Sequence, residues 1–497
     1  MPAISKLSKN LLLVYTAQAL NGIVGVVAVP LTVKLLGAAG YGLLSIYGLM
    51  SSYVLLADFG ISKNLLRLLS ATTHAETQTR HIRVVLGMYV VLCTAWLMAT
   101  PILSFVVSHY VFPVSAQYAG VLRWMPLVAV MEFILGVPAS VMQTACVARQ
   151  RFELYAGYSV ATGLTRNGAL IAAAILFPSP LVIAIALALR KVIDGLVAGS
   201  IMGWIGAPAW RPVFELSGFR RMLSQSLRLS TAQVLQSTVM NIGSPLVNAV
   251  FGLQALGFYR AAFDVAGKIA VVSNGVTLVV FPRAARYFGS TARLERDSSA
   301  ISVIMRCSAT VYGCFAAGAV LAAPHILPFI GLKQDLTVRL FILLIIALSL
   351  NAHSLLGNEL LQAAGTYLYS IYLNAGALVV LCVTFVAMKP AAGAMAIGWA
   401  WIGAALLSAC FADGLLLSLF KSPAVRQATT LLAKVAATGA CVALAGHEFR
   451  VFPATAAVSG GLTLLLLLGW SLRDSISLLR AWNAKPVSEP AIAAIYA

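Results

Sequence analysis

Charged residues are scarce in this chain. Only 10% of its 497 residues are Asp, Glu, Lys or Arg, whereas soluble proteins average about 25%. Hydrophobic residues make up 60% of the chain, and the mean hydropathy is +0.92. This composition excludes an ordinary soluble domain and indicates a polytopic membrane protein.

The sequence also lacks the short motifs of cofactor and metal chemistry. It contains no phosphate-binding loop of the G-x-x-x-x-G-K-[ST] type, no H-E-x-x-H pair and no EF-hand loop. The seven cysteines all fall inside apolar runs and show no metal-ligand spacing, so they are interpreted as small packing residues. No cofactor and no metal are predicted.

Apolar runs of about 20 residues, the length that crosses the hydrocarbon core, recur along the whole chain. About fourteen are found, at residues 10–36, 41–65, 82–107, 118–148, 154–177, 181–205, 224–251, 256–281, 301–324, 336–363, 366–388, 393–420, 424–445 and 453–472. Between the first two runs lies a glycine-rich turn at residues 37–42, which predicts a tight hairpin because such a reversal needs unusual backbone dihedrals.

The net charge of +19 does not indicate a nucleic-acid partner, because the cations are spread over alternate loops. One set of loops carries about 22 Lys and Arg residues and the opposite set about 5, which is the positive-inside bias. Lys63 and Arg67 would then hold the end of the second span on the cytoplasmic side. Both termini are predicted to be cytoplasmic, and the first span, which carries Gln18 and Asn21, is interpreted as an uncleaved segment.

An internal repeat organises the chain. Shifting the sequence by 215 positions aligns residues 16–42 with residues 231–257 without a gap, and Thr16, Ala17, Gln18, Leu20, Pro30, Leu31, Gly37 and Gly42 then meet identical residues. Six spans separate the copies, so both enter the membrane in the same sense, as in a parallel repeat related by a pseudo-twofold axis along the membrane normal. The predicted fold class is an all-α polytopic protein with two six-helix lobes at residues 1–207 and 208–421. An extra helix pair at residues 422–475 and a cytoplasmic tail at residues 476–497 follow.

The segments LLGAAGYGLLSI and LLADFGISKNLLRLLS carry a family resemblance. Over residues 11–70 the chain resembles the polysaccharide-transporter branch of the multidrug/oligosaccharidyl-lipid/polysaccharide superfamily, which includes Wzx-type flippases. The resemblance implies two six-helix bundles in a V around a cavity. It also implies transport of a lipid-diphosphate-linked oligosaccharide from the cytoplasmic to the periplasmic leaflet.

A charged stripe in the eighth span is the main candidate site. Arg260, Asp264 and Lys268 are spaced four apart, so they share one helix face and lie within pairing reach of one another. Each costs about 2.5–3.5 kcal/mol at mid-membrane, so the stripe should face protein or water rather than lipid. Two interpretations stay open: an internally paired stripe that packs the bundle, and a cationic cavity wall that binds diphosphate through Arg260 and Lys268 with Asp264 as organiser or titrating switch.

Other polar groups within the spans are secondary candidates. Polar amides align in the two repeats and are interpreted either as a lining for sugar or as interhelical hydrogen bonds: Gln18, Asn21, Gln233 and Gln236. Further charged candidates for substrate binding or charge organisation are Arg123, Glu132, Arg166, Arg190, Lys191 and Asp194, with Arg190 and Asp194 able to pair along one helix face.

Asp58 is interpreted as a structural interface residue. Glu359, His353 and Asp413 are each treated as single intramembrane groups, any of which could take up a proton or sodium ion.

These observations predict a flippase that works by alternating access in a bacterial inner membrane, with a polysaccharide polymerase as an expected partner. A membrane-embedded polymerase or ligase is the first alternative. It would need a large outward loop with acid and base groups, whereas the longest outward connection, near residues 324–336, offers only His325, Lys333 and Asp335. A multidrug exporter of the same superfamily is the second alternative, and it would want an acidic or aromatic lining for organic cations.

Overall fold

The fold was analysed in a computed structural model of the whole chain. It describes residues 2–202 apart from 57, 59–60, 72–73, 113, 115 and 150, then 211–214, 231 and 233–269, single residues and short runs between 305 and 332, and residues 334–363 and 367–420. Every regular element in these ranges is a helix. They are α1 (Pro2–Leu56), α2 (Ile61–Ala71), α3 (Ala75–Val106), η1 (Val107–Val111), α4 (Ala116–Ala148), α5 (Phe152–Leu176), α6 (Pro180–Met202), α8 (Gly243–Ala266), η3 (Gly267–Ile269), α11 (Asp335–Ala363), α12 (Tyr367–Ala392), η4 (Gly393–Met395) and α13 (Ala396–Phe420).

Helix α1 contains the predicted hairpin. Its 55 residues would extend about 80 Å as one straight helix, far more than the roughly 30 Å of the hydrocarbon core. The helix is interrupted at Gly37, which has φ 72° and ψ 169°. This left-handed region is open to glycine because it has no Cβ. The sequence-based prediction of a glycine reversal between the first two spans is therefore confirmed.

The second repeat has the same interruption at the equivalent position. Gly252, which aligns with Gly37 under the shift of 215, has φ 79° and ψ 179° inside α8. The two hairpins also touch through a second aligned pair of glycines. A Cβ on Gly257 would lie 1.8 Å from the Ala38 carbonyl oxygen, and a Cβ on Gly42 would lie 2.6 Å from the Leu253 oxygen. The repeat read from the sequence thus corresponds to two like hairpins packed backbone to backbone.

One predicted boundary is wrong. The second span was expected to run to residue 65, but α1 ends at Leu56 and a separate short helix, α2, begins at Ile61. Asp58 causes the break: its Oδ1 accepts a hydrogen bond from the backbone N–H of Ile61 at 2.6 Å, and its Oδ2 accepts one from the Ser62 hydroxyl at 2.6 Å. An aspartate in this position caps a new helix N-terminus. Lys63 and Arg67 therefore belong to α2 rather than to the end of the second span.

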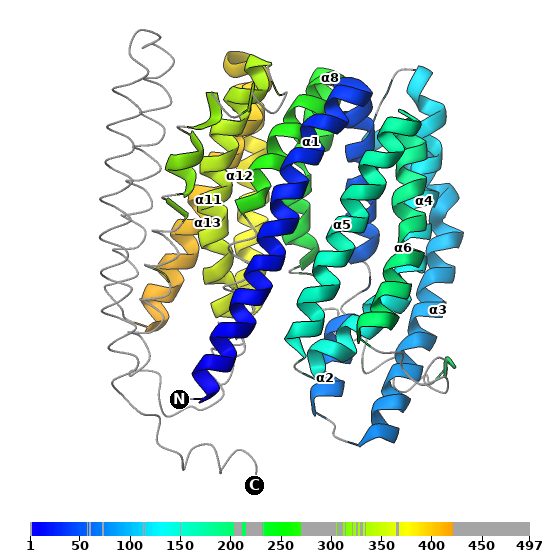
Figure 1. Cartoon of the computed structure of the whole chain (residues 1–497). Coiled ribbons are helices and arrows are strands. Elements are labelled where there is room, and N and C mark those ends of the chain that lie inside the picture. The colour runs from blue at the N-terminus through cyan, green and yellow to red at the C-terminus, as the bar shows by residue number, and fades with distance from the viewer. Residues whose placement is uncertain are drawn as a thin grey trace.

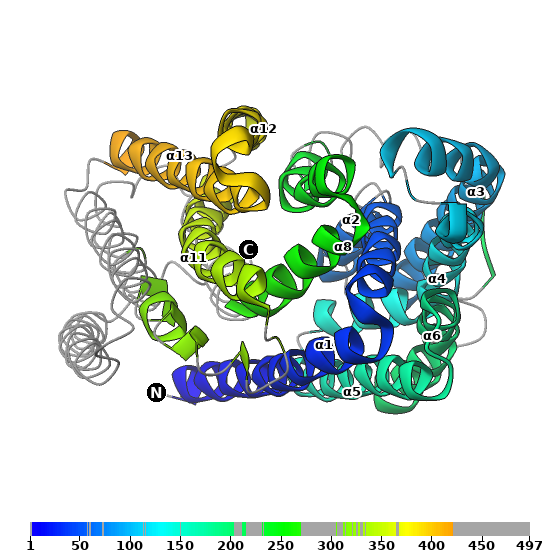
Figure 2. The same cartoon turned by 90° about the horizontal axis from the view of Figure 1, so that it is seen from above.

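The described helices form two bundles, named here the N-lobe (α1–α6) and the C-lobe (α8, η3 and α11–α13). Within the N-lobe, α4 packs against α6 and α1 against α5; within the C-lobe, α13 packs against α11 and α12. Helices α1 and α8 form the main contact between the lobes, and Figure 2 shows them between α11–α13 on one side and α3–α6 on the other. In Figure 1, α1 lies beside both α5 and α8. Seven helical segments of the described residues are long and apolar enough to span a membrane, so the chain is a multi-pass membrane protein.

The division of the chain into four domains stays a prediction. The helix pair expected at residues 422–475, the tail after it and half of the ninth span lie outside the described residues. The count of fourteen spans therefore remains an expectation for the whole chain.

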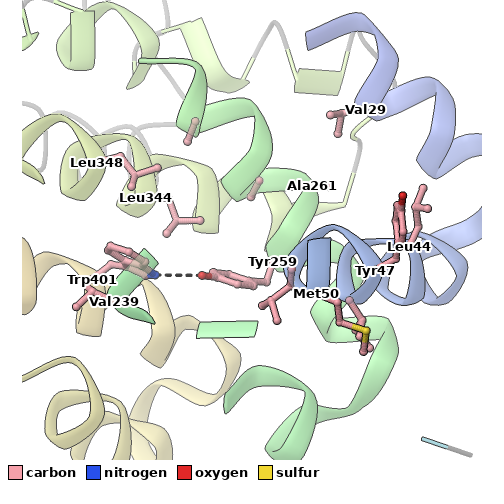
Figure 3. Close-up of a cluster of buried hydrophobic side chains, with 14 of the residues drawn as sticks. Val29, Leu44, Tyr47, Met50, Val239, Tyr259, Ala261, Leu344, Leu348 and Trp401 are labelled. Carbon is pink, nitrogen blue, oxygen red and sulfur yellow. Dashed lines mark hydrogen bonds between the residues drawn. The ribbon is translucent and has the colours of Figure 1, made fainter. Parts of the chain in front are cut away.

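Helix α8 is anchored to the C-lobe by aromatic side chains. The Trp401 indole N–H donates a hydrogen bond to the Tyr259 hydroxyl at 3.1 Å, drawn as the dashed line in Figure 3. The Phe263 and Trp401 rings lie 5.5 Å apart between centroids. This buried cluster fixes the rotation of α8, and so determines which of its residues can face α1.

Candidate functional site

The charged stripe of α8 lies at the contact between the lobes. Arg260 donates a hydrogen bond from Nη2 to Asp264 Oδ1 at 2.8 Å. The other carboxylate oxygen, Oδ2, accepts a hydrogen bond at 2.6 Å from the hydroxyl of Tyr41, which belongs to α1 in the N-lobe. Asp264 therefore connects an arginine of its own helix to the opposite lobe.

The Arg260 guanidinium is only partly satisfied. Its side chain is 12% exposed, and its Nε and Nη1 are buried with no hydrogen-bond acceptor among the described residues. Its Cζ lies 5.0 Å from the centre of the Phe263 ring, a cation–π contact that supports the group without satisfying its N–H donors. An unpaired buried donor costs about 1–3 kcal/mol, so this site favours an additional acceptor.

Lys268 departs from the predicted stripe. The sequence interpretation placed it on the same helix face, within pairing reach of Asp264, but α8 ends at Ala266 and Lys268 lies in the 3₁₀ turn η3. Among the described residues no carboxylate lies within 4 Å of its Nζ. The ammonium lies instead over α1, where a Cβ on Gly25 would be 2.9 Å from Nζ. The tightening of the last helical turn thus directs this cation across the lobe boundary.

A second charged cluster fills the interior of the N-lobe. Arg190 donates to Asp194 at 2.8 Å along α6, and its Nη2 lies 3.6 Å from Glu132 of α4. Lys191 Nζ lies 3.9 Å from both carboxylates. Three hydroxyl groups complete the cluster: Tyr47 and Ser51 of α1 donate to Glu132, each at 2.7 Å, and Thr165 of α5 donates to Asp194 at 3.0 Å. Two cations face two anions, so this cluster has no charge surplus.

The predicted amides occupy different environments. Asn21 donates from Nδ2 to the Ser159 carbonyl of α5 at 2.8 Å and fills the space left by Gly163, while its Oδ1 is buried without a partner among the described residues. Gln233 and Gln236 are half-buried on the helical segment before α8. The side chain of Gln18 lies outside the described residues. Asn21 therefore joins two N-lobe helices, and the shared amide lining stays a prediction.

The remaining charged candidates differ in how close they lie to the contact between the lobes. Arg123 is exposed on α4, where its backbone carbonyl accepts a hydrogen bond from Ser104. Arg166 is exposed on α5, within electrostatic range of Tyr41 and Lys268. Glu359 is half-buried near the end of α11 and takes part in an interaction of its own. Of these three, Arg166 is the one that adds positive charge to the lobe contact.

His353 and Asp413 are not single groups, as the sequence interpretation had them. His353 of α11 and Asp413 of α13 are both buried, and Nε2 lies 3.2 Å from Oδ2. Sixty positions separate them in the chain, and only the packing of α11 against α13 brings them together.

The lobe contact has the chemistry of an anion site. Arg260 and Lys268 outnumber Asp264, so these three groups have one positive charge in surplus. Two nitrogens of Arg260 have no acceptor in the described part of the chain. Guanidinium and ammonium groups with free donors bind phosphate oxygens well. In the described parts of the chain no three His, Cys, Asp or Glu side chains lie close enough together to hold a metal ion.

Tyr41 is the functional candidate that sequence reasoning missed. It lies within the glycine-rich turn that was interpreted only as a reversal. The local signal for its role is weak: it is a hydroxyl-bearing residue between two apolar runs, four residues after Gly37. Its partner is 223 positions away, so no spacing rule could have linked them.

The comparisons with known proteins agree with this architecture. Residues 7–288 match the family model described as "Polysaccharide biosynthesis protein". A search of curated protein sequences found no match. Among solved structures, the fold is similar to the lipid II flippase MurJ in an inward closed conformation, with a TM-score of 0.61 and 12% identity over 94% of this chain and all of that one.

Two transporters of the MATE family have similar folds. One, an inward-facing multidrug resistance transporter of the MOP superfamily, has a TM-score of 0.58 and 15% identity over 84% of this chain and 96% of its own. The other, VcmN from Vibrio cholerae, has a TM-score of 0.58 and 14% identity over 86% of this chain and all of its own. At these identities the likeness establishes the fold, and the family model establishes the membership. The chain therefore belongs to the polysaccharide biosynthesis protein family and shares the fold of the multidrug/oligosaccharidyl-lipid/polysaccharide (MOP) superfamily.

Proposed function

We propose that this protein is a flippase that moves a polyprenyl-diphosphate-linked oligosaccharide from the cytoplasmic to the periplasmic leaflet by alternating access, for polysaccharide export. The single observation that carries the proposal is the cationic contact between the lobes. Lys268 lies over α1 of the N-lobe, and Arg260 is linked to Tyr41 of that lobe through Asp264. These three charged groups have one positive charge in surplus, and two guanidinium nitrogens of Arg260 have no acceptor among the described residues. A diphosphate supplies both the negative charge and the acceptor oxygens.

Asp264 would couple binding at Arg260 to the contact between the lobes. The carboxylate now holds Arg260 with one oxygen and Tyr41 of the other lobe with the second. When a diphosphate binds Arg260, it competes with Asp264 for the guanidinium, and the carboxylate loses its counter-charge. The hydrogen bond between the lobes and the charge balance around it then change together, which favours rearrangement of the α1–α8 contact.

The other predicted residues take supporting roles in this proposal. Gln18, Asn21, Gln233 and Gln236 would offer hydrogen bonds to sugar hydroxyls, while the polyprenyl chain stays in lipid. Arg166 would raise the positive potential beside Lys268, and Arg123 would meet the head group at the membrane surface. Asp194 with Arg190, and Glu359, would organise charge within the lobes.

The proposed direction of transport and the proposed membrane location of the protein rest on the distribution of charge among the loops. About 22 cations on one set of loops against about 5 on the other favour cytoplasmic termini in a bacterial inner membrane. A polysaccharide polymerase would receive the transported unit on the periplasmic side, and a proton or sodium ion would drive the cycle.

A multidrug exporter is the competing function, and the similarity to MATE folds favours it. Export of organic cations is poorly served by a lobe contact whose surplus charge is positive. A membrane-embedded glycan polymerase or ligase would need acid and base groups on an outward connection. Transport of a lipid-linked anion is therefore the function that we propose.

Deletion of the gene, followed by a leaflet-resolved assay of lipid-linked oligosaccharide, tests the function. Accumulation on the cytoplasmic leaflet supports flipping. A normal leaflet distribution with unjoined repeat units outside supports a polymerase. Unchanged oligosaccharide together with sensitivity to cationic drugs supports an exporter.

A further inference from the structure

The C-lobe contains a buried pair of ionisable groups that the anion site does not use. His353 Nε2 and Asp413 Oδ2 lie 3.2 Å apart between α11 and α13, with side-chain exposures of 0% and 4%. The two helices pack closely beside the pair, because a Cβ on Gly357 of α11 would lie 3.2 Å from the Ala412 Cβ of α13. The pair is therefore shielded from water in this conformation.

The environment of the second oxygen of Asp413 indicates that the pair carries a proton. Oδ1 is buried and accepts no hydrogen bond from any described residue. A buried carboxylate with a bare oxygen is strongly unfavourable unless its charge is neutralised. One proton on the pair achieves this, either on the carboxyl group or on the imidazole, because both forms leave the pair with no net charge.

We propose that His353 and Asp413 form a proton-binding site that is loaded in the closed conformation and releases its proton when the C-lobe helices admit water. This inference rests on the proposed transport function, for which it names the coupling ion and its place. Loss of the proton leaves one negative charge in a low-dielectric interior, so release requires a conformation in which water reaches the pair. Proton exchange is thereby tied to the opening of the lobe.

The chemistry of the pair favours a proton over sodium. Hard cations bind to several oxygen ligands. Here the pair has one carboxylate, and one of its oxygens already contacts the imidazole Nε2. The described residues also offer no cluster of three acidic, His or Cys side chains around it. A proton needs only the two groups that are present.

Other charged groups on the surrounding helices lie elsewhere in the described C-lobe. On α11, Glu359 is six positions after His353, about 9 Å along the axis, while Asp335 and Arg339 pair with each other near the first turn. On α12, Lys389 is in the last turn. On α8, Arg260 and Asp264 pair with each other. No Lys or Arg of the described residues lies within 4 Å of Asp413, so His353 provides its positive partner.

The test uses full-length protein in proteoliposomes and two independent measurements. The first is infrared difference spectroscopy across a pH titration. It detects the change in carboxyl or carboxylate absorption of Asp413 when either group of the pair gains or loses the proton, and it needs no substrate. The second is flipping of a fluorescent polyprenyl diphosphate sugar with and without an imposed pH gradient. The variants are Asp413→Asn, which is neutral and nearly isosteric, and His353→Gln, with Asp335→Asn as the matched control on an exposed carboxylate.

We expect a pH-sensitive carboxyl signal in the wild type and in Asp335→Asn that Asp413→Asn abolishes and His353→Gln shifts. We also expect a gradient of one pH unit to change the transbilayer distribution of the probe by up to about tenfold per proton exchanged. That response should disappear in both variants of the pair.

An unchanged carboxyl signal in Asp413→Asn, or a normal gradient response in both variants, overturns the inference. If Asp413→Asn does not fold, His353→Gln decides by the same criteria. If the wild-type protein flips the probe but shows no carboxyl signal, the flippase proposal is supported and the proton site is refuted. If it shows the carboxyl signal but does not flip the probe, the flippase proposal is refuted and the proton site is supported.

Discussion

Gly42 and Gly257 occupy equivalent positions in the two repeats and lie in backbone contact across the lobes. The Gly42 Cβ position is 3.1 Å from the Gly257 backbone nitrogen, and the Gly257 Cβ position is 1.8 Å from the Ala38 oxygen. Any side chain at Gly257 would collide with backbone atoms, which cannot rotate out of the way. The approach of the hairpins, and with it the contact that holds Tyr41 near Asp264, depends on these two glycines.

Replacement of Gly257 by alanine should therefore separate the hairpins. The added methyl group cannot fit, and overpacking of this kind costs about 1–3 kcal/mol. Spin labels on the exposed residues Lys34 and Gln254, one in each hairpin region, should report a longer distance in Gly257→Ala by pulsed electron paramagnetic resonance. Gly48→Ala is the control on α1, because no atom lies within 4 Å of its Cβ position. Equal distances in the two variants would contradict this account of the contact.

Removal of the Tyr41 hydroxyl should loosen the same contact without touching the cation. Tyr41→Phe keeps the ring but loses the hydrogen bond to Asp264, and hydrogen bonds to charged groups contribute about 1.5–3 kcal/mol. The label distances should shift toward the separated population by roughly tenfold or more. Tyr110→Phe, at an exposed tyrosine of η1 away from the lobe contact, should leave the distribution unchanged. A Tyr41→Phe protein with the wild-type distribution would show that the hydroxyl does not hold the lobes together.

The sequence predicted those parts of this arrangement that depend on local pattern. The reversal at Gly37 and its copy at Gly252 followed from glycine spacing and from the repeat, since backbone conformation at a glycine-rich turn is set locally. The hydrogen bond from Tyr41 to Asp264 and the pairing of His353 with Asp413 could not be predicted, because each joins helices that only tertiary packing brings together. Asp58 carried a usable capping signal, but the apolar residues on both sides of it obscured the break.

Loss of the Arg260 side chain should abolish transport while leaving membrane insertion intact. Arg260→Ala removes the two guanidinium nitrogens that have no acceptor among the residues described, and it leaves Asp264 without its paired cation. Flipping of a polyprenyl diphosphate sugar should fall at least tenfold, and Arg260→Lys should recover only part of it, because an ammonium cannot form a bidentate contact with phosphate. Arg339→Gln is the control, since that arginine is in a solvent-exposed pair with Asp335, and such pairs contribute about 0.3–0.5 kcal/mol. Wild-type transport by a well-expressed Arg260→Ala protein would remove this residue from the site.

Variants of Arg190 can distinguish a structural role of this residue from a role in substrate binding. It is buried in a cluster whose two cations and two anions balance, so Arg190→Met alone leaves Glu132 and Asp194 with only Lys191 and should destabilise the protein by about 3–5 kcal/mol. The double variant Arg190→Met with Asp194→Leu removes one charge of each sign and should recover most of that loss in thermal denaturation. If Arg190 holds the cluster together, the double variant transports normally. If Arg190 binds diphosphate, the double variant recovers stability but not transport, and the substrate path then extends from the lobe contact into the N-lobe.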